Sequence, residues 1–349
     1  MKKFMKGIGA LAIALLSLVG CTSKSTQQLQ EAKCPIKIGL VTDTNGIDDM
    51  GINQESWNAI SAYAKDQGLS VSCYSYLQAT SESDFIPFLS QMGEDEMDIV
   101  IVPGSTISSV LEEVAINYPS TSYVAIASIE ASNVVAVEFD HDSPMYLAGV
   151  TAALKAVAAQ ANKVGYIGYE ESSLNEIAFK EGVAYVAPEL EILSSYVGDS
   201  SVEDTQKVAH DLYNEGAYVI YADSSSNILG VYNETSTRRS NGEDVWLIDL
   251  SEELPVEGEY VSSVLIGISY DMGTVIRNCI KEKRALTLIK EGIKTIYMGN
   301  DTGYSLVNTN NLSPEMLVTI SEINEKIIHG EIVIGSSIVE IEEENTEKE

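Results

Sequence analysis

Short apolar runs alternate with helical stretches along most of the chain, and this alternation predicts the elements of the fold. The runs are nearly continuous in Val, Ile, Ala and Tyr, which is typical of parallel strands covered on both faces. They lie at residues 36–41, 71–76, 98–102, 123–127, 134–139, 163–167, 192–197, 218–222, 245–250, 260–266 and 295–298. Strands of this kind separated by helices predict an α/β protein with parallel sheets.

The stretches between the runs carry the sequence marks of helix ends. In residues 53–67, Trp57, Ile60 and Ala64 fall on one helical face, and Gly68 stands where a C-terminal glycine cap belongs. Ser-Pro starts or Gly ends mark further helices beginning at 143 and spanning 205–215 and 313–329. The strands are too many for one sheet of ordinary size, so we expect two α/β lobes, with a break near 140–144.

The first residues have the pattern of an export signal. Basic Lys2, Lys3 and Lys6 precede an apolar stretch at 8–19, which is shorter than a membrane span. Leu-Val-Gly-Cys then ends at Cys21, and this resembles a bacterial lipobox. We therefore expect a signal peptide at 1–20, a diacylglycerol anchor on Cys21, and a polar tether at 21–35. The expected location is the extracytoplasmic face of the cell membrane. An ordinary secretory signal with a chance cysteine is the alternative.

Charge excludes several classes of partner. The chain has 349 residues, with 21 Lys and Arg against 52 Asp and Glu, for a formal net charge of −31. Such a polyanion repels nucleic acid and anionic lipid headgroups, so neither is expected as an electrostatic partner. The acidic residues 341–349 are expected to be a disordered tail.

Three cysteines remain besides the anchor. Cys34, Cys73 and Cys279 lie at no metal-like spacing, so no metal site is expected. One disulfide is possible, but buried isolated thiols are the favoured interpretation.

Polar residues follow the predicted strands, where open α/β sheets bind ligands. Ordinary helix capping remains the alternative for each of them taken singly. The candidates are Asp43, Thr44, Gly104, Ser105 and Ser128 in the first half, and Asp223, Ser224 and Asp249 in the second. The sequence has no nucleophile elbow, phosphate-binding loop or zinc-protease motif, so we expect neither an enzyme nor a cofactor.

One block of sequence carries a family resemblance. Residues 41–49 (VTDTNGIDD), together with Asn53, Gln54 and Trp57, resemble the opening of the basic membrane protein lipoproteins. Weaker matches occur at 83–90, 146–150, 163–168, 196–198 and 312–315, so the resemblance covers roughly 36–334. Members of this family are purine-nucleoside-binding components of ABC importers with a type I periplasmic-binding fold.

The resemblance implies two Rossmann-like lobes joined by a hinge of three crossovers. Lobe one would comprise 36–140 plus 268–300, and lobe two 141–267 plus 301–340. It also implies that Asp43 and Asn53 bind the ligand, with Phe179 as an aromatic wall.

This chain departs from the family at several ligand positions. Ile52 replaces a stacking aromatic, and residues 223–226 (DSSS) replace a glycine-rich loop. Ala127 and Ser251 stand where the family has Asp, and Ile266 stands where it has Lys.

Two functional hypotheses follow. The first is a lipid-anchored solute-binding protein that delivers a nucleoside-like ligand to an ABC permease. The second is a degenerate surface lipoprotein that senses a ligand or contacts other molecules without transport. Retained Asp43 and Asn53 favour the first hypothesis, whereas the replaced ligand groups favour the second.

Overall fold

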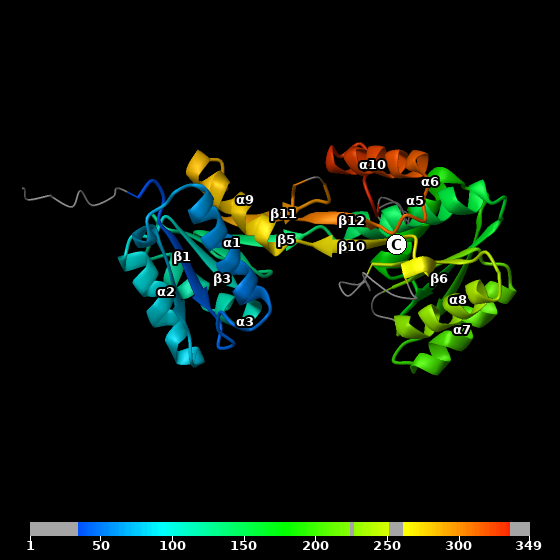
Figure 1. Cartoon of the computed structure of the whole chain (residues 1–349), viewed down its shortest axis with the longest axis horizontal. Helices are drawn as coiled ribbons and strands as arrows, with labels where there is room; N and C mark the ends of the chain where they lie inside the picture. The colour runs from blue at the N-terminus through cyan, green and yellow to red at the C-terminus, as the bar shows by residue number, and fades with distance from the viewer. Residues whose placement is uncertain (1–33, 224–226, 251–260, 300, 336–349) are drawn as a thin grey trace, which may run out of the picture. The chain divides into compact units, whose positions relative to one another are not determined.

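The structure is a computed structural model that describes residues 34–335, except for 224–226, 251–260 and 300 (Figure 1). The expected signal peptide, Cys21 with its expected lipid, most of the expected tether, Ser224, Ser251 and the acidic tail lie outside the described residues. In the part that is described, none of the helices combines the length and the apolar character needed to cross a membrane.

The first lobe is built on a six-stranded parallel sheet. Its strand order is β11-β5-β4-β3-β1-β2. The strands are β1 (Ile38–Thr42), β2 (Tyr74–Gln78), β3 (Ile99–Pro103), β4 (Ser122–Ile126), β5 (Val134–Phe139) and β11 (Gly292–Ile296).

Helices cover both faces of this sheet, as its doubly apolar strands require. Ile38 and Leu40 face a core shared with α1 (Ile52–Asp66) and α9 (Met272–Ala285). Val41 points the other way, toward α2 (Phe85–Glu94) and α4 (Leu111–Ala115), and the short α3 (Ser105–Ser108) lies on this second face. The alternation of side chains along each strand therefore assigns every strand residue to one of the two cores.

The second lobe has a four-stranded parallel sheet in the order β7-β6-β8-β9. Its elements are α5 (Asp142–Ala158), β6 (Lys163–Gly168), α6 (Leu174–Val186), β7 (Glu191–Tyr196), α7 (Val202–Asn214), β8 (Val219–Ala222), α8 (Ile228–Ser240) and β9 (Trp246–Asp249). Helices α5 and α6 pack closely because glycines meet at their crossing. A Cβ on Gly149 would collide with the carbonyl of Phe179, and one on Gly182 with the carbonyl of Tyr146.

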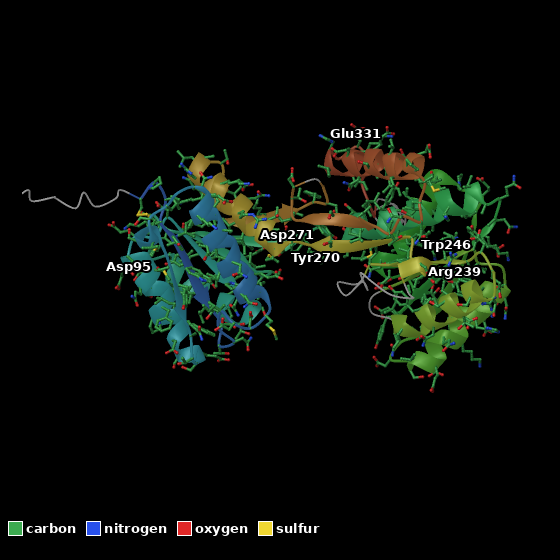
Figure 2. The ribbon with its side chains drawn as sticks, viewed as in Figure 1. Asp95, Arg239, Trp246, Tyr270, Asp271 and Glu331 are labelled. Carbon is green, nitrogen blue, oxygen red and sulfur yellow. A yellow bond between two sulfur atoms is a disulfide. The ribbon has the colours of Figure 1, made fainter. Side chains whose placement is uncertain are left out.

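Three crossovers connect the two lobes. The chain passes from β5 into α5, from β10 (Ile266–Tyr270) into α9, and from β11 into β12 (Tyr304–Asn308) and α10 (Pro314–Ile328). Strands β10 and β12 form an antiparallel pair, and Tyr270 stacks on Tyr304 with 4.9 Å between ring centroids. Figure 2 labels Tyr270 beside Asp271, whose side chain caps α9. The expected class of two α/β lobes with parallel sheets is confirmed; the lobe boundaries stay a prediction.

The strand expected at 260–266 is wrong. Val261–Ser263 forms a short 3-10 turn, and β10 begins only at Ile266. Val264 and Leu265 are fully buried and touch Leu247 through a single bridge, so burial rather than strand pairing explains this part of the apolar run. Strand β12 was not predicted, because its Ser and Asn break the apolar pattern.

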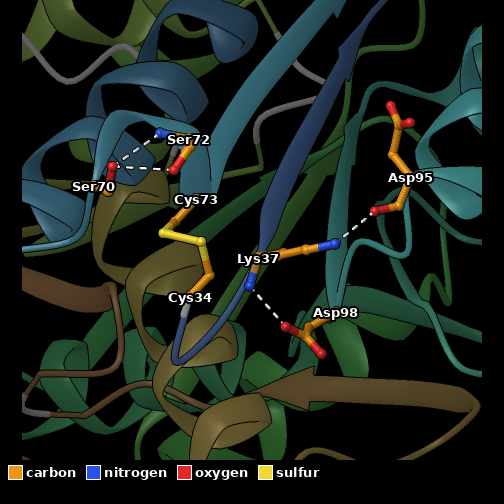
Figure 3. The surroundings of a disulfide bond; sticks show 7 residues. All are labelled: Cys34, Lys37, Ser70, Ser72, Cys73, Asp95 and Asp98. Atoms are coloured by element: carbon orange, nitrogen blue, oxygen red, sulfur yellow. Dashed lines mark hydrogen bonds between the residues drawn. A yellow bond between two sulfur atoms is a disulfide. The ribbon is translucent and has the colours of Figure 1, made fainter. Parts of the chain in front are cut away.

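The favoured interpretation of the cysteines is wrong for two of them. Cys34 and Cys73 form a disulfide, with their Cα atoms 5.4 Å apart (Figure 3). Because Ile38 pairs with Tyr74, the segments that enter β1 and β2 lie side by side and bring both thiols together. Cys279 is a buried free thiol, and burial raises its pKa to about 12.

Candidate functional site

Asp43 and Asn53 meet at the carboxyl end of β1. The Asn53 side chain, at the start of α1, donates from Nδ2 to Oδ1 of Asp43 over 2.8 Å. The same Oδ1 accepts the backbone N–H of Asn45 at 2.9 Å. Asn53 is completely buried and Asp43 is half-buried, so the pair joins the helix to the strand end.

Asp49 holds Asn53 in place through hydrogen bonds. The sequence pattern did not predict Asp49 as a site residue. Its Oδ1 accepts the N–H groups of Gly51 at 2.8 Å and Gln54 at 3.0 Å. Its Oδ2 accepts the backbone N–H of Asn53 at 3.3 Å and the side-chain Nδ2 at 2.9 Å. Burial by itself raises the pKa of Asp49, but these hydrogen bonds outweigh it and the net shift is downward. The available signal was an acidic residue just ahead of a helix start.

The two carboxylates orient the Asn53 amide. Because Nδ2 donates to both Asp43 and Asp49, the amide oxygen must point away from them. That oxygen, Oδ1, is buried and has no hydrogen-bond partner among the described residues. An unpaired buried acceptor costs free energy, so a ligand with an N–H or O–H donor would gain by binding there.

Among the other candidates of the first lobe, Gly104 lies beside Asp43. Gly104 adopts a φ of 89°, and a Cβ on it would lie 3.5 Å from Oδ2 of Asp43. Ser105 opens α3 and is exposed, as are Thr44 and Ser128. Ile52 opens α1 and packs half-buried against the core.

In the second lobe, Asp223 follows β8 and Asp249 ends the adjacent β9, and both are buried. Asp223 accepts from Nδ2 of Asn175 at 2.8 Å and from the hydroxyl of Tyr166 at 3.3 Å. Asp249 pairs in register with Ala222 and accepts the Tyr232 hydroxyl at 2.8 Å. Both carboxylates therefore have partners in their own lobe.

Two residues singled out by the family resemblance lie in the core. Phe179 has no exposed surface and packs between Tyr166 and Tyr221, with ring centroids 5.7 and 5.3 Å away. Ile266 is likewise buried at the start of β10. The structure thus brings together Asp43, Asn53 and Gly104, and places Phe179 away from solvent.

Two α/β lobes, each built on a parallel sheet, are joined by three crossovers and carry hydrogen-bonding groups at their strand ends. This arrangement defines a periplasmic solute-binding fold. The structure is similar to a solute-binding protein of an ABC transporter from Conexibacter woesei, with a TM-score of 0.58, 18% identity, and coverage of 85% of this chain and 98% of that one. A solute-binding protein from Aeropyrum pernix gives a TM-score of 0.51 at 18% identity, over 88% and 97%.

The family is defined by sequence. Residues 36–337 match the family described as "ABC transporter substrate-binding protein PnrA-like", and the chain belongs to this family. The nucleoside-binding protein BmpA of Lactococcus lactis is 25% identical, over 96% of this chain and all of that protein. Basic membrane protein B of Borreliella burgdorferi is 23% identical, over 93% and 94%. The protein is therefore a substrate-binding component of an ABC transporter, and its family is one of solute-binding proteins rather than enzymes.

Proposed function

We propose that this protein is a lipid-anchored, extracytoplasmic receptor that captures a nucleoside-like small polar ligand between its lobes and passes it to an ABC permease. The observation that carries the proposal is the Asp43–Asn53 pair. Its geometry leaves the amide oxygen of Asn53 buried and without a hydrogen-bond partner among the described residues. Nucleosides present N–H and O–H donors that such an acceptor can bind.

The relatives and the N-terminus support the remaining parts. The Lactococcus lactis relative is named a nucleoside-binding protein, and relatives in Pyrococcus are named lipoproteins. In this chain, Cys21 after an apolar stretch is the position for the anchor. A dual-chain lipid would hold the receptor beside the permease.

The polar groups past the strand ends also limit the ligand's charge. In the described residues, no Lys or Arg stands directly after a strand of either sheet, whereas Asp43 and Asp223 do and Asp249 ends β9. Carboxylates at these strand ends repel phosphate groups, so a neutral or cationic ligand rich in donors is favoured over a nucleotide.

The test is calorimetry with neutral nucleosides on wild type, Asp43→Ala and the control Asp48→Ala. Asp48 is an exposed carboxylate in the same loop, which makes it a matched control. We expect Asp43→Ala to abolish binding and the compaction seen on ligand addition by solution scattering, while it still unfolds cooperatively. Unchanged affinity in Asp43→Ala would place the site elsewhere. Failure of wild type to bind any nucleoside would favour a surface lipoprotein without transport.

A further inference from the structure

Extending the strand register of the first lobe by one to three residues brings four residues level with one another, three just past the ends of β1, β3 and β4 and one, Glu138, next to the last residue of β5. Continuing the pairs Ile38–Ile99, Ile99–Ser122 and Tyr123–Val134 brings Asp43, Gly104, Ala127 and Glu138 into one line. We call these four residues the strand-end row. In a parallel sheet, laterally paired residues point to the same face.

The apolar core beneath α2 and α4 shows which side of the sheet Glu138 faces. Two residues before each of Asp43, Gly104 and Ala127 stand Val41, Val102 and Ala125, all in the core beneath α2 and α4. Val134, four residues before Glu138, belongs to the same core. Period-two alternation within β5 therefore turns Glu138 toward that side, whereas Asp43, just past β1, bonds to Asn53 of α1.

Within the row, two carboxylates flank two very small residues. Asp43 and Glu138 are separated by three strand spacings, or about 14 Å, so one donor group cannot reach both. Gly104 and Ala127 lie between the two carboxylates, and their small size leaves room for a ligand above them. Among the described residues other than its chain neighbours, only Oδ2 of Asp43 lies within 4 Å of the position that a Cβ on Gly104 would take. All four residues are half-buried, so they can contact a ligand.

Glu138 has an unmet hydrogen-bonding requirement. Its Oε1 is buried, and no group in the described part of the chain bonds to it. Thr295 of β11 is level with Glu138, whereas the neighbouring Lys294 binds Glu282 of α9 at 2.9 Å, on the opposite face of the sheet. Burying a carboxylate oxygen without a partner is unfavourable, and such a group calls for a specific explanation.

We propose that Glu138 is the second carboxylate of the ligand site and a determinant of its specificity. The ligand lies over Gly104 and Ala127 and donates an N–H or O–H group at each end, one to the Asp43–Asn53 pair and one to Glu138. This inference rests on the proposed function and adds the requirement for two separated donors.

The experiment measures nucleoside affinity and apo stability in Glu138→Gln and Glu138→Ala. Glu112→Gln, an exposed acid on α4 over the same face, is the matched control. The probes are adenosine, inosine, guanosine, cytidine and uridine, titrated by calorimetry. For the nucleoside that wild type binds most tightly, we expect Glu138→Gln to weaken affinity about tenfold, because a charge-assisted bond becomes a neutral one. Glu138→Ala should weaken it further, and the control should match wild type.

Apo stability separates a ligand contact from a structural role. Removing the unpartnered carboxylate should leave the apo melting temperature of Glu138→Ala equal to or above that of wild type. A fall of several degrees, or affinities within threefold of wild type in both variants, would overturn the assignment. If Asp43→Ala loses binding and the Glu138 variants do not, only this inference fails. If wild type binds none of the probes, the proposed function fails and this inference falls with it.

Discussion

Replacing Asp49 by Ala tests how the site is held together. The substitution removes the acceptor for the backbone N–H groups of Gly51, Asn53 and Gln54 and for the Asn53 side chain. Two of these amides lie in the first turn of α1, where no earlier carbonyl can accept from them. The Asn53 side chain is fully buried and cannot turn to water for a new partner.

The magnitude follows from these contacts. Loss of a side-chain acceptor at a helix start costs about 1 kcal/mol. The weakened buried amide of Asn53 adds roughly 1–2 kcal/mol. We therefore expect Asp49→Ala to lower the free energy of unfolding by about 2–3 kcal/mol. Ligand affinity should also fall, because the Asn53 amide loses one of the two bonds that orient it.

Urea unfolding of wild type, Asp49→Ala and Asp48→Ala measures this effect. Asp48 precedes Asp49 in the same loop but is exposed, so its removal should change stability by less than about 0.5 kcal/mol. The unfolding slope should stay constant, so that the shift in midpoint reports stability alone. Equal losses in the two variants would refute the capping role.

The same prediction has a pH dependence. Burial raises the pKa of Asp49, but its hydrogen bonds outweigh this and lower it in the folded state. A lowered folded pKa gives stability that is present above the unfolded pKa and lost as the pH falls through the folded value. The stability gap between wild type and Asp49→Ala should therefore persist at neutral pH and close under strongly acidic conditions. A gap that grew on acidification would contradict the sign of the shift.

Three further predictions concern the anchor, the disulfide and the ligand. Mass spectrometry of the native protein should find Cys21 as the mature N-terminus with a diacylglycerol adduct, and any other start would refute the lipobox assignment. Cys73→Ser removes the disulfide to Cys34, 39 residues away in sequence, and should lower the free energy of unfolding by about 4 kcal/mol, the value expected from the lost chain-entropy restraint. Cys279→Ala, at a free buried thiol, is the control: a reductant should destabilise this variant as it does wild type, but should not destabilise Cys73→Ser further. Because the family resemblance implies that several groups holding a purine nucleoside are replaced in this chain, calorimetry should show weak or absent binding of inosine, guanosine and adenosine, and nanomolar affinity for any of them would show that the residue correspondence is wrong.

Much of the fold could be predicted from local pattern. Apolar runs fix strands because their side chains must be buried on both faces, and glycines and Ser-Pro pairs mark helix ends. The helix predicted at 313–329 is found as α10, with Ser313 as its cap. The pattern failed at 260–266, where buried residues lie beside the sheet without pairing into it.

The sequence by itself predicted the class of fold, which the structure confirms, together with an export signal and the polar candidates Asp43 and Asn53, which stay predictions. Only the tertiary structure decided which residues become neighbours. Cys34 meets Cys73 because β1 pairs with β2, and Asp43 is level with Glu138 because β3 and β4 lie between β1 and β5. Local sequence sets the periodicity of burial along a strand, but lateral register depends on which strands pair and with what offset, and that is fixed by packing between segments far apart in the chain.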